Sequence, residues 1–494
     1  MSWTPVECVG AYVPRYRLPA ETVREAWGQF HGAGITQTAV PAADEDTLTM
    51  AYEAATRALA GSAIERDGVG RLFVATTTPP AEEEAMGPRL VSMLGLGAET
   101  VTRQFSGSTR AGVEALVAAC SYTDAHSTRQ STLVVATDAP RGAPDSEHEH
   151  AGGAGAVAAL VNSSGSARVT DVAEHVEAYP GTRFRLAGST ETTGLGVTGY
   201  DRTAFIDTVT EAVRGLETDP SDADAVCLQS PNGKLPYRVA GTLGVETDAI
   251  QRGTLVHEVG DTGVANPLLG LVAALEDGAE RVVLVGYGSG GGATALTVEL
   301  DGVALETEGI APEIEEIESE ATVDLSYGEY LRMRGDITPG EPAGGGAYVS
   351  VPNWKRTIPQ RHRLAAGRCP ACGTLSFPPD GACTGCRTLV DYEEVTLSGT
   401  GTVETATTIG QGGAPPEFVE QQARSGAYVS AIVALDGPDG TETVSIPTQV
   451  VGAGAESVTI GDAVEATIRR IYTQEGVTRY GFKMRPTVSS AQSE

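Results

Sequence analysis

The sequence predicts an α/β protein in which a large, duplicated, layered domain is followed by a zinc ribbon and a small β-barrel. Strand-like and helix-like segments alternate over residues 1–345, which is typical of a sheet covered by helices. Two Cys-x2-Cys pairs follow, and after them short stretches alternate apolar and polar residues. A chain of 494 residues is too long for one hydrophobic core, so several domains are expected.

The strands and helices of the first domain are predicted from apolar runs and from helical periodicity. The expected strands are 71–76, 132–137, 156–161, 225–229, 281–285 and 293–298, and the clearest helices are 46–60 and 111–121. A strand, a Gly-rich turn and a second strand occur twice, at 134–160 and at 283–296. Because another strand lies roughly 60 residues upstream in both cases, we expect two similar halves that form one five-layered body.

Four regions follow from these patterns. The layered domain is assigned to residues 1–300, and a Glu- and Gly-rich tether with one short helix to residues 301–349. Residues 350–390 hold a helix and the ribbon, and residues 391–486 are expected to form a barrel of five or six strands, of the OB type.

The cysteine spacing predicts a structural zinc site. The ligands are expected to be Cys369, Cys372, Cys383 and Cys386. Ten residues separate the two pairs, and a glycine lies at the turn of each pair. Four thiolates complete a tetrahedral zinc shell and leave no position for a substrate. Two disulfides are the alternative, but the spacing and the intracellular character of the chain favour zinc.

The net charge of −31, with 65 acidic and 34 basic residues and only three lysines, argues against nucleic acid or anionic membrane as partners. It suits solubility in concentrated salt. The barrel region alone has 13 acidic and six basic residues and few aromatic ones, which opposes a nucleic-acid-binding function, the remote alternative. We find no basic, apolar leader and no 18-residue apolar run, so a halophilic, cytoplasmic protein is expected.

Several motifs carry a resemblance to a known family. They are residues 10–17 (GAYVPRYR), 230–236 (SPNGKLP), 268–271 (LLGL) and 286–290 (GYGSG). With these motifs the first 340 residues resemble archaeal-type 3-hydroxy-3-methylglutaryl-CoA synthase, of the thiolase superfamily. Residues from 350 on, with Trp354, Arg356, the four cysteines and the closing 480–486 (YGFKMRP), resemble the zinc-ribbon and OB-fold accessory proteins of such enzymes. The resemblance implies a thiolase-like fold, acyl-CoA as ligand, a homodimer and a separate thiolase as partner.

The resemblance also places three residues at the family's catalytic positions. Thr109 falls on the nucleophilic cysteine, Thr77 on the general-base glutamate and Gln229 on the histidine. A cysteine at a helix start is readily deprotonated, whereas a threonine hydroxyl needs a neighbouring base. Because neither Thr77 nor Gln229 is such a base, ordinary synthase turnover is not expected.

Other parts of the implied coenzyme A site are present. Contacts to the coenzyme are expected from Lys234, Asn232 and Gly288, with a solvated loop charge as the alternative for Lys234. Main-chain amides at Thr109 and near Ser289 are candidates for an anion-stabilising pair, with plain turn chemistry as the alternative for Ser289.

Some local alternatives stay open. Ser108 is a candidate for a displaced nucleophile, but a helix N-cap is favoured. Asp261 is a candidate acid or base, with a solvated or hydrogen-bonded carboxylate as the alternative. His148 and His150 lie in a Glu-His-Glu-His run, which is interpreted as exposed and not as a metal site.

Two functions are therefore expected in order of preference. The first is an acyl-CoA-handling scaffold or divergent subunit of a thiolase or acyltransferase complex. The second is an active acyltransferase or C–C lyase with a non-standard nucleophile.

Overall fold

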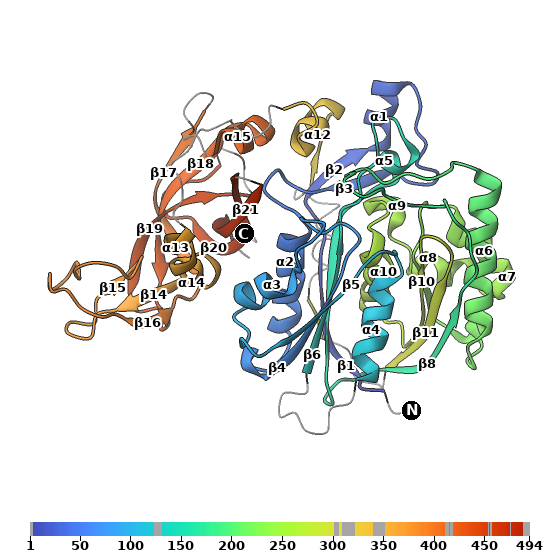
Figure 1. Ribbon diagram of the computed structural model, residues 1–494, viewed down its shortest axis with the longest axis horizontal. Helices are drawn as coiled ribbons and strands as arrows, with labels where there is room; N and C mark the ends of the chain where they lie inside the picture. Colours follow the sequence, from blue (N-terminus) through green and yellow to red (C-terminus); the bar gives the residue numbers. More distant parts are fainter. Residues whose placement is uncertain are drawn as a thin grey trace, which may run out of the picture. The chain divides into compact units, whose positions relative to one another are not determined.

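The computed structural model describes residues 3–122, 131–300, 306–308, 322–338, 351–410, 414, 418–452, 454, 457–474 and 476–487. The chain divides into two compact units. Unit 1 comprises Met1–Val91 and Leu96–Tyr330, and unit 2 comprises Ser92–Gly95 and Leu331–Glu494. Figure 1 colours both along the sequence.

The first half of unit 1 is built on five strands. They are β1 (Val6–Tyr12), β4 (Val69–Ala75), β5 (Val101–Phe105), β6 (Ser131–Asp138) and β7 (Gly155–Val161). Their order in the sheet is β5-β4-β6-β7-β1. β4 is parallel to β5 and β6, whereas β7 is antiparallel to both β6 and β1.

The second half repeats this pattern, which confirms the predicted duplication. Its strands are β8 (Ala167–His175), β9 (Ala225–Leu228), β10 (Arg281–Tyr287) and β11 (Ala293–Leu300), in the order β8-β11-β10-β9. β9 and β10 are parallel, and β11 is antiparallel to β10 and β8. β1 also pairs with β8, so both halves, together with the short β12, form one ten-stranded sheet.

Helices complete the layers of unit 1. α2 (Thr47–Ala60) packs on β1, β6 and β7, and α6 (Thr198–Arg214) packs on β8, β10 and β11. Between the two half-sheets lie α4 (Ala111–Ser121) and α10 (Asn266–Glu276), which contact each other and strands of both halves (Figure 1). The arrangement of helix, sheet, helix pair, sheet and helix gives the five expected layers.

Small residues allow the central helices to approach closely. α4 has the sequence AGVEALVAACS, and a methyl group on Gly112 would come within 2.2 Å of the main-chain oxygen of Val264. This close approach brings the start of α4 next to the segment that precedes α10.

The N-terminus of α2 is fixed by a capping box, in which the Asp46 side chain accepts from the amides of Leu48 and Thr49.

The remaining elements of unit 1 are short. They are β2 (Tyr16–Pro19), α1 (Ala20–Trp27), β3 (Gln37–Val40), η1 (Arg66–Gly68), α3 (Gly87–Leu94), α5 (Glu147–Ala151), η2 (Pro220–Asp222), α7 (Leu235–Leu243), α8 (Thr247–Arg252), α9 (Val256–Val259), η3 (Gly263–Ala265), β12 (Glu306–Glu308), β13 (Val323–Asp324) and α12 (Tyr327–Arg334), which continues into unit 2. β12 pairs with β1 and β13 with β2, so parts of the expected tether add strands to the body.

Unit 2 contains the ribbon and a closed barrel. The ribbon sheet consists of β14 (Ala365–Arg368), β15 (Leu375–Ser376) and β16 (Glu393–Thr396), preceded by α13 (Val351–Arg356) and α14 (Ile358–Arg363). The barrel strands are β17 (Thr400–Ile409), β18 (Tyr428–Asp436), β19 (Thr443–Val450), β20 (Ala463–Gln474) and β21 (Val477–Pro486), with α15 (Val419–Ser425) before β18. Every second side chain of β18 is buried, as the alternation predicted.

The sequence located the long, apolar strands and helices of unit 1 and missed others. The six predicted strands and two predicted helices all exist, whereas β1, β2, β3, β5 and β8 were not predicted. β16 pairs with β14 of the ribbon sheet, and the closed barrel consists of β17, β18, β19, β21 and β20. Within the described residues, no helix has the length and apolar character needed to cross a membrane.

Candidate active site and zinc site

Thr109 lies in the turn before α4 and is only 2% exposed. Its hydroxyl donates to the main-chain oxygen of Tyr287, the last residue of β10, at 2.7 Å. The side chain at the predicted nucleophile position is thus committed as a hydrogen-bond donor to the backbone. Neither the amide of Thr109 nor that of Ser289 donates to any group in the described part of the chain, so both stay available to an anion.

Thr77 follows β4 and binds a buried carboxylate that sequence reasoning missed. Its amide and hydroxyl donate to the two carboxylate oxygens of Asp138 at 2.7 and 2.8 Å. Asp138 is fully buried and also accepts from Thr76, Thr78 and the amide of Val264. Because both of its oxygens are hydrogen-bonded, this carboxylate anchors the 76–78 segment in a fixed position. The run of three threonines at 76–78 was the sequence signal for a buried acceptor.

Gln229 and Asp261 lie together in the same region. The Nε2 of Gln229 donates to Oδ1 of Asp261 at 3.1 Å, and the amide of Gly263 donates to the same oxygen at 3.0 Å. Arg183 forms an ion pair with the other oxygen of Asp261. Asp261 is 3% exposed. It is therefore a buried, hydrogen-bonded carboxylate and not a solvated one. Its charge is compensated by Arg183, a residue that sequence reasoning did not identify.

A second arginine reaches the same site. Arg185 donates to the main-chain oxygen of Thr77. Both arginines come from the irregular segment between β8 and α6, and their spacing of two residues in an extended chain places them on one face. That alternation, Arg-Phe-Arg-Leu at 183–186, was the available signal.

The interpretation of residues 147–150 as an exposed run is wrong. They belong to α5, in which Ser146 caps Glu149, and both Glu149 and His150 are 1% exposed. His148 lies beside Gly194, and burial together with the charge of Arg183 lowers its pKa to about 4. The site therefore contains a neutral imidazole at physiological pH.

His150 belongs to a cluster with His31 and Asp145, whose potential ligand atoms lie within 4.8 Å of one another. Two imidazoles and a carboxylate are common metal ligands, but the hydrogen bonding of His150 does not suit a metal ion. Nδ1 of His150 accepts from the amide of His31 at 2.9 Å, which places the proton of the neutral ring on Nε2, the atom that faces Asp145. A protonated nitrogen cannot coordinate a metal, so no metal is assigned to this cluster.

Ser108 is not the helix cap that was favoured. α4 begins after Arg110 without a side-chain cap, and the Ser108 hydroxyl is buried without a hydrogen-bond partner. Side-chain atoms of Arg110, Gln229 and Thr262 are likewise buried and unpaired among the described residues. The positions around Thr109 thus offer polar atoms to a ligand.

The Gly-rich turn between β10 and β11 closes on the other side of Ser108. The amide of Gly288 donates to the main-chain oxygen of Gly292 at 2.8 Å, and Ser289 lies inside this turn. A methyl group on Gly288 would come within 2.2 Å of the Ser108 hydroxyl oxygen. Residue 288 must therefore be small for the turn to approach the start of α4.

Asn232 and Lys234 precede α7. The side-chain oxygen of Asn232 accepts from the amides of Lys234 and Leu235 at 3.0 and 3.2 Å and fixes the turn that leads into this helix. The side chain of Lys234 is exposed. Coenzyme contacts at these two residues stay a prediction.

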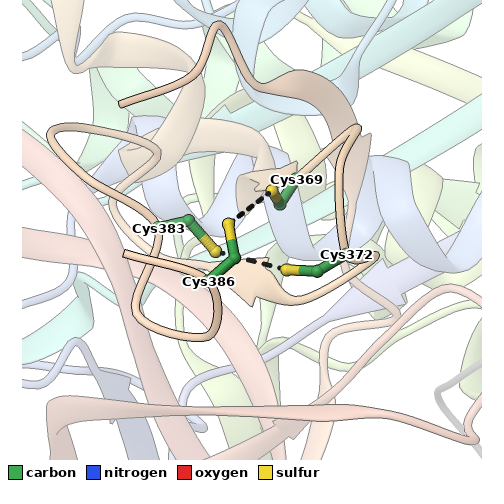
Figure 2. A group of neighbouring side chains, drawn as sticks. All are labelled: Cys369, Cys372, Cys383 and Cys386. Atoms are coloured by element: carbon green, nitrogen blue, oxygen red, sulfur yellow. Dashed lines mark hydrogen bonds between the residues drawn. The ribbon is translucent and has the colours of Figure 1, made fainter. Parts of the chain in front are cut away.

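The four cysteines of unit 2 converge on one point, as Figure 2 shows. The sulfurs of Cys372 and Cys383 are 3.6 Å apart and those of Cys369 and Cys386 are 3.8 Å apart, and all four cysteines are free. Ligands at 2.3 Å around a tetrahedral zinc are separated by roughly 3.8 Å, so the geometry fits zinc and not disulfides. Hydrogen bonds from Thr374 lower the pKa of Cys372 to about 6, which favours its thiolate, whereas burial raises the pKa of Cys369 to about 11.

Comparison with curated proteins places unit 1 in a family. Hydroxymethylglutaryl-CoA synthase of Methanopyrus kandleri is 30% identical over 342 residues, which cover 66% of this chain and 95% of the relative. The chain belongs to the hydroxymethylglutaryl-CoA synthase family. The synthase of Methanosarcina acetivorans is 28% identical over 342 residues, covering 66% of this chain and 97% of that protein.

Solved synthase structures share the fold. A crystal structure of HMG-CoA synthase complexed with CoA matches with a TM-score of 0.60 at 17% identity, covering 70% of this chain and 94% of that one. MvaS in complex with 3-hydroxy-3-methylglutaryl coenzyme A gives a TM-score of 0.57 at 20% identity, covering 70% and 95%.

Unit 2 matches two further domain families. Residues 356–390 match the ChsH2 rubredoxin-like zinc ribbon domain, and residues 394–469 match the ChsH2 C-terminal OB-fold domain. The expected fold is thereby confirmed in its three parts: thiolase-like body, zinc ribbon and OB-fold barrel.

Proposed function

We propose that this protein is an acyl-CoA-handling subunit of the hydroxymethylglutaryl-CoA synthase family that does not perform ordinary synthase turnover. Its body binds an acyl-CoA, and its ribbon and barrel hold a separate thiolase. The observation that carries the proposal is the hydrogen bond from Thr109 to the carbonyl of Tyr287, in a site where Thr77 and Gln229 supply no base.

Binding of acyl-CoA is supported by the fold and by the lining of the site. The neighbour structures include complexes with CoA and with 3-hydroxy-3-methylglutaryl coenzyme A. Here the free amides of Thr109 and Ser289 and the unpaired hydroxyl of Ser108 supply donors for a thioester carbonyl. Lys234, Asn232 and Gly288 are proposed for the coenzyme itself.

A test combines binding with covalent chemistry. The full chain is titrated with acetyl-CoA in concentrated salt, then incubated with labelled acetyl-CoA and analysed by peptide mass. We expect saturable binding without an acyl adduct and without hydroxymethylglutaryl product. Product formed by the purified chain alone would overturn the proposal.

The second candidate is an active acyltransferase or C–C lyase, and one observation favours it. The Ser108 hydroxyl is buried without a partner, and the neutral imidazole of His148 lies in the same region of unit 1. An acyl adduct on residue 108 or 109 would select this candidate over the first.

The scaffold role is tested by co-expression with a thiolase. The two proteins are expected to co-purify in a high-salt buffer. High salt is chosen because the acidic surface of the chain suits a halophilic cytoplasm, in which salt screens the repulsion between like charges. Failure to co-purify, with acyl-CoA binding intact, would remove the scaffold part of the proposal only.

A homodimer through unit 1 is proposed from the edge strand β5. In the described part of the chain, β5 pairs with β4 on one side only, and Val101 on it is 40% exposed. Val101→Glu is expected to shift the sedimentation coefficient from dimer to monomer. Val477→Glu, at a barrel residue that is 42% exposed, is the matched control.

A further inference from the structure

The segment between β8 and α6 contains a loop that is closed at its base. The amide of Leu195 donates to the main-chain oxygen of Gly181 at 2.9 Å. Gly181 and Gly196 both have positive φ angles, of 87° and 67°, which other residues rarely adopt. The loop thus begins and ends at glycines that can absorb a change of backbone direction.

Within the loop the two arms pair with each other. Phe184 and Thr193 exchange main-chain hydrogen bonds of 2.8 and 2.9 Å. Residues 181–196, here called the 181–196 hairpin, therefore have main-chain hydrogen bonds of their own that join the two arms.

Along residues 183–186 of the hairpin the charged side chains face the body and the apolar side chains face solvent, the reverse of the usual arrangement. Arg183 and Arg185 are partly buried and point to the site, whereas Phe184 and Leu186 are 38% and 68% exposed. The attachment to the body is polar. Lifting the hairpin would therefore expose little apolar surface, which is the main cost of opening a packed element.

Four polar contacts of the hairpin with the body are identified among the described residues, and one of them is a side-chain hydrogen bond between Thr182 and Tyr287. Arg183 pairs with Asp261, Arg185 donates to the carbonyl of Thr77, and the amide of Thr192 donates to the carbonyl of Arg141 at 2.7 Å. Water can replace each of these partners once the hairpin has moved. Two of these contacts, those at Asp261 and Thr77, end on residues that were themselves predicted as catalytic candidates.

We propose that the 181–196 hairpin is a hinged cover of the site around Thr109, held closed by Arg183 and Arg185. Thr109 is 2% exposed, and in this proposal a ligand reaches it when the two arginines leave Asp261 and Thr77. The inference takes its choice of site from the proposed function, and its test needs no acyl-CoA.

Access to residue 109 is measured with a thiol probe in the full chain. Thr109→Cys places a reporter at the covered position, and its reaction with a maleimide is followed by peptide mass analysis of the segment around residue 109. In the background of Arg183→Gln and Arg185→Gln, we expect labelling at least tenfold faster. A labelling rate unchanged by the two substitutions would overturn the proposal.

A matched control removes the same charge elsewhere. Arg202→Gln with Arg238→Gln changes two exposed arginines on α6 and α7 and is expected to leave the labelling rate as in the parent. Should the double variant fail to fold, Arg185→Gln alone leaves the Arg183–Asp261 pair intact. It is expected to give an intermediate rate, and an unchanged rate would again count against the cover.

Hydrogen exchange separates hinged opening from local unfolding. A hinged cover releases the amide of Thr192 from Arg141 but keeps the mutual bonds of Phe184 and Thr193. In the arginine variant we expect faster exchange at Thr192 and unchanged exchange at the other two amides. Equal acceleration at all three would show unfolding of the hairpin and would contradict the hinge. Loss of acetyl-CoA binding with both readouts intact would count against the proposed function and not against the cover.

Discussion

The hydroxyl of Thr109 donates to the main-chain oxygen of Tyr287, 178 residues away along the chain. This bond joins the start of α4, from the first half of the duplicated body, to the end of β10 in the second half. It gives the threonine a structural role at the position that the resemblance predicted for the nucleophile.

Thr109→Val tests this role, because valine keeps the shape and removes the donor. The buried carbonyl of Tyr287 then lacks its partner, and we expect a loss of about 1–2 kcal/mol in the free energy of unfolding, measured with urea at fixed high salt. Thr203→Val, on the exposed side of α6, is the control and should stay within about 0.5 kcal/mol of the parent. A Thr109→Val protein as stable as the parent would refute the role.

Asp138→Asn is expected to destabilise unit 1 more strongly. The carboxylate accepts hydrogen bonds from Thr76, Thr77, Thr78 and Val264. In asparagine one of the two oxygens becomes an NH2 group, which would face hydrogen-bond donors instead of acceptors. We expect a loss of about 2–4 kcal/mol by urea unfolding, since hydrogen bonds to charged groups are the stronger ones. Asp222→Asn, at an exposed residue, should be nearly neutral.

Zinc is expected at one ion per chain, measured by elemental analysis of the purified protein. Cys383→Ala removes a buried ligand and should abolish stoichiometric zinc and lower the melting temperature of unit 2. Cys120→Ala removes a buried thiol of α4 and should keep the zinc. Full zinc content in the Cys383→Ala protein would contradict the four-cysteine site.

His148 makes stability depend on pH. Its pKa is about 4 in the folded chain and 6.5 in the unfolded one, so the unfolded state alone takes up a proton as the pH falls below 6.5. The contribution of the neutral His148 ring to the free energy of unfolding is complete above pH 6.5 and is lost toward pH 4. The loss amounts to roughly 2 kcal/mol between pH 7 and pH 5. His148→Gln should make this part of the stability curve less steep, and the remaining slope is expected from His150, whose pKa burial also lowers to about 4.

Two measurements check the assignment. The His175→Gln protein keeps His148 and is expected to keep the steep slope between pH 7 and pH 5. Nuclear magnetic resonance of the His148 ring should show the neutral form at pH 5. A ring that titrates near 6.5 would contradict its burial beside Arg183.

Much of the fold follows from local patterns. The cysteine spacing specified the zinc ribbon because a knuckle is formed by neighbouring residues. The Ala-rich run at 111–121 located α4 because helix propensity belongs to the individual residues. Strands such as β5 and β8 were missed, since their mixed, partly exposed residues carry no continuous apolar signal.

The sequence by itself determined the family, the domain order and the residue types at positions 77, 109 and 229. Only the tertiary structure decided what these residues touch: Thr109 on Tyr287, Thr77 on Asp138 and Gln229 on Asp261. It also decided that His148 lies beside Arg183 rather than in an exposed run. The physical reason is that burial and hydrogen-bond partners are set by chain segments far apart in sequence, which no local pattern specifies.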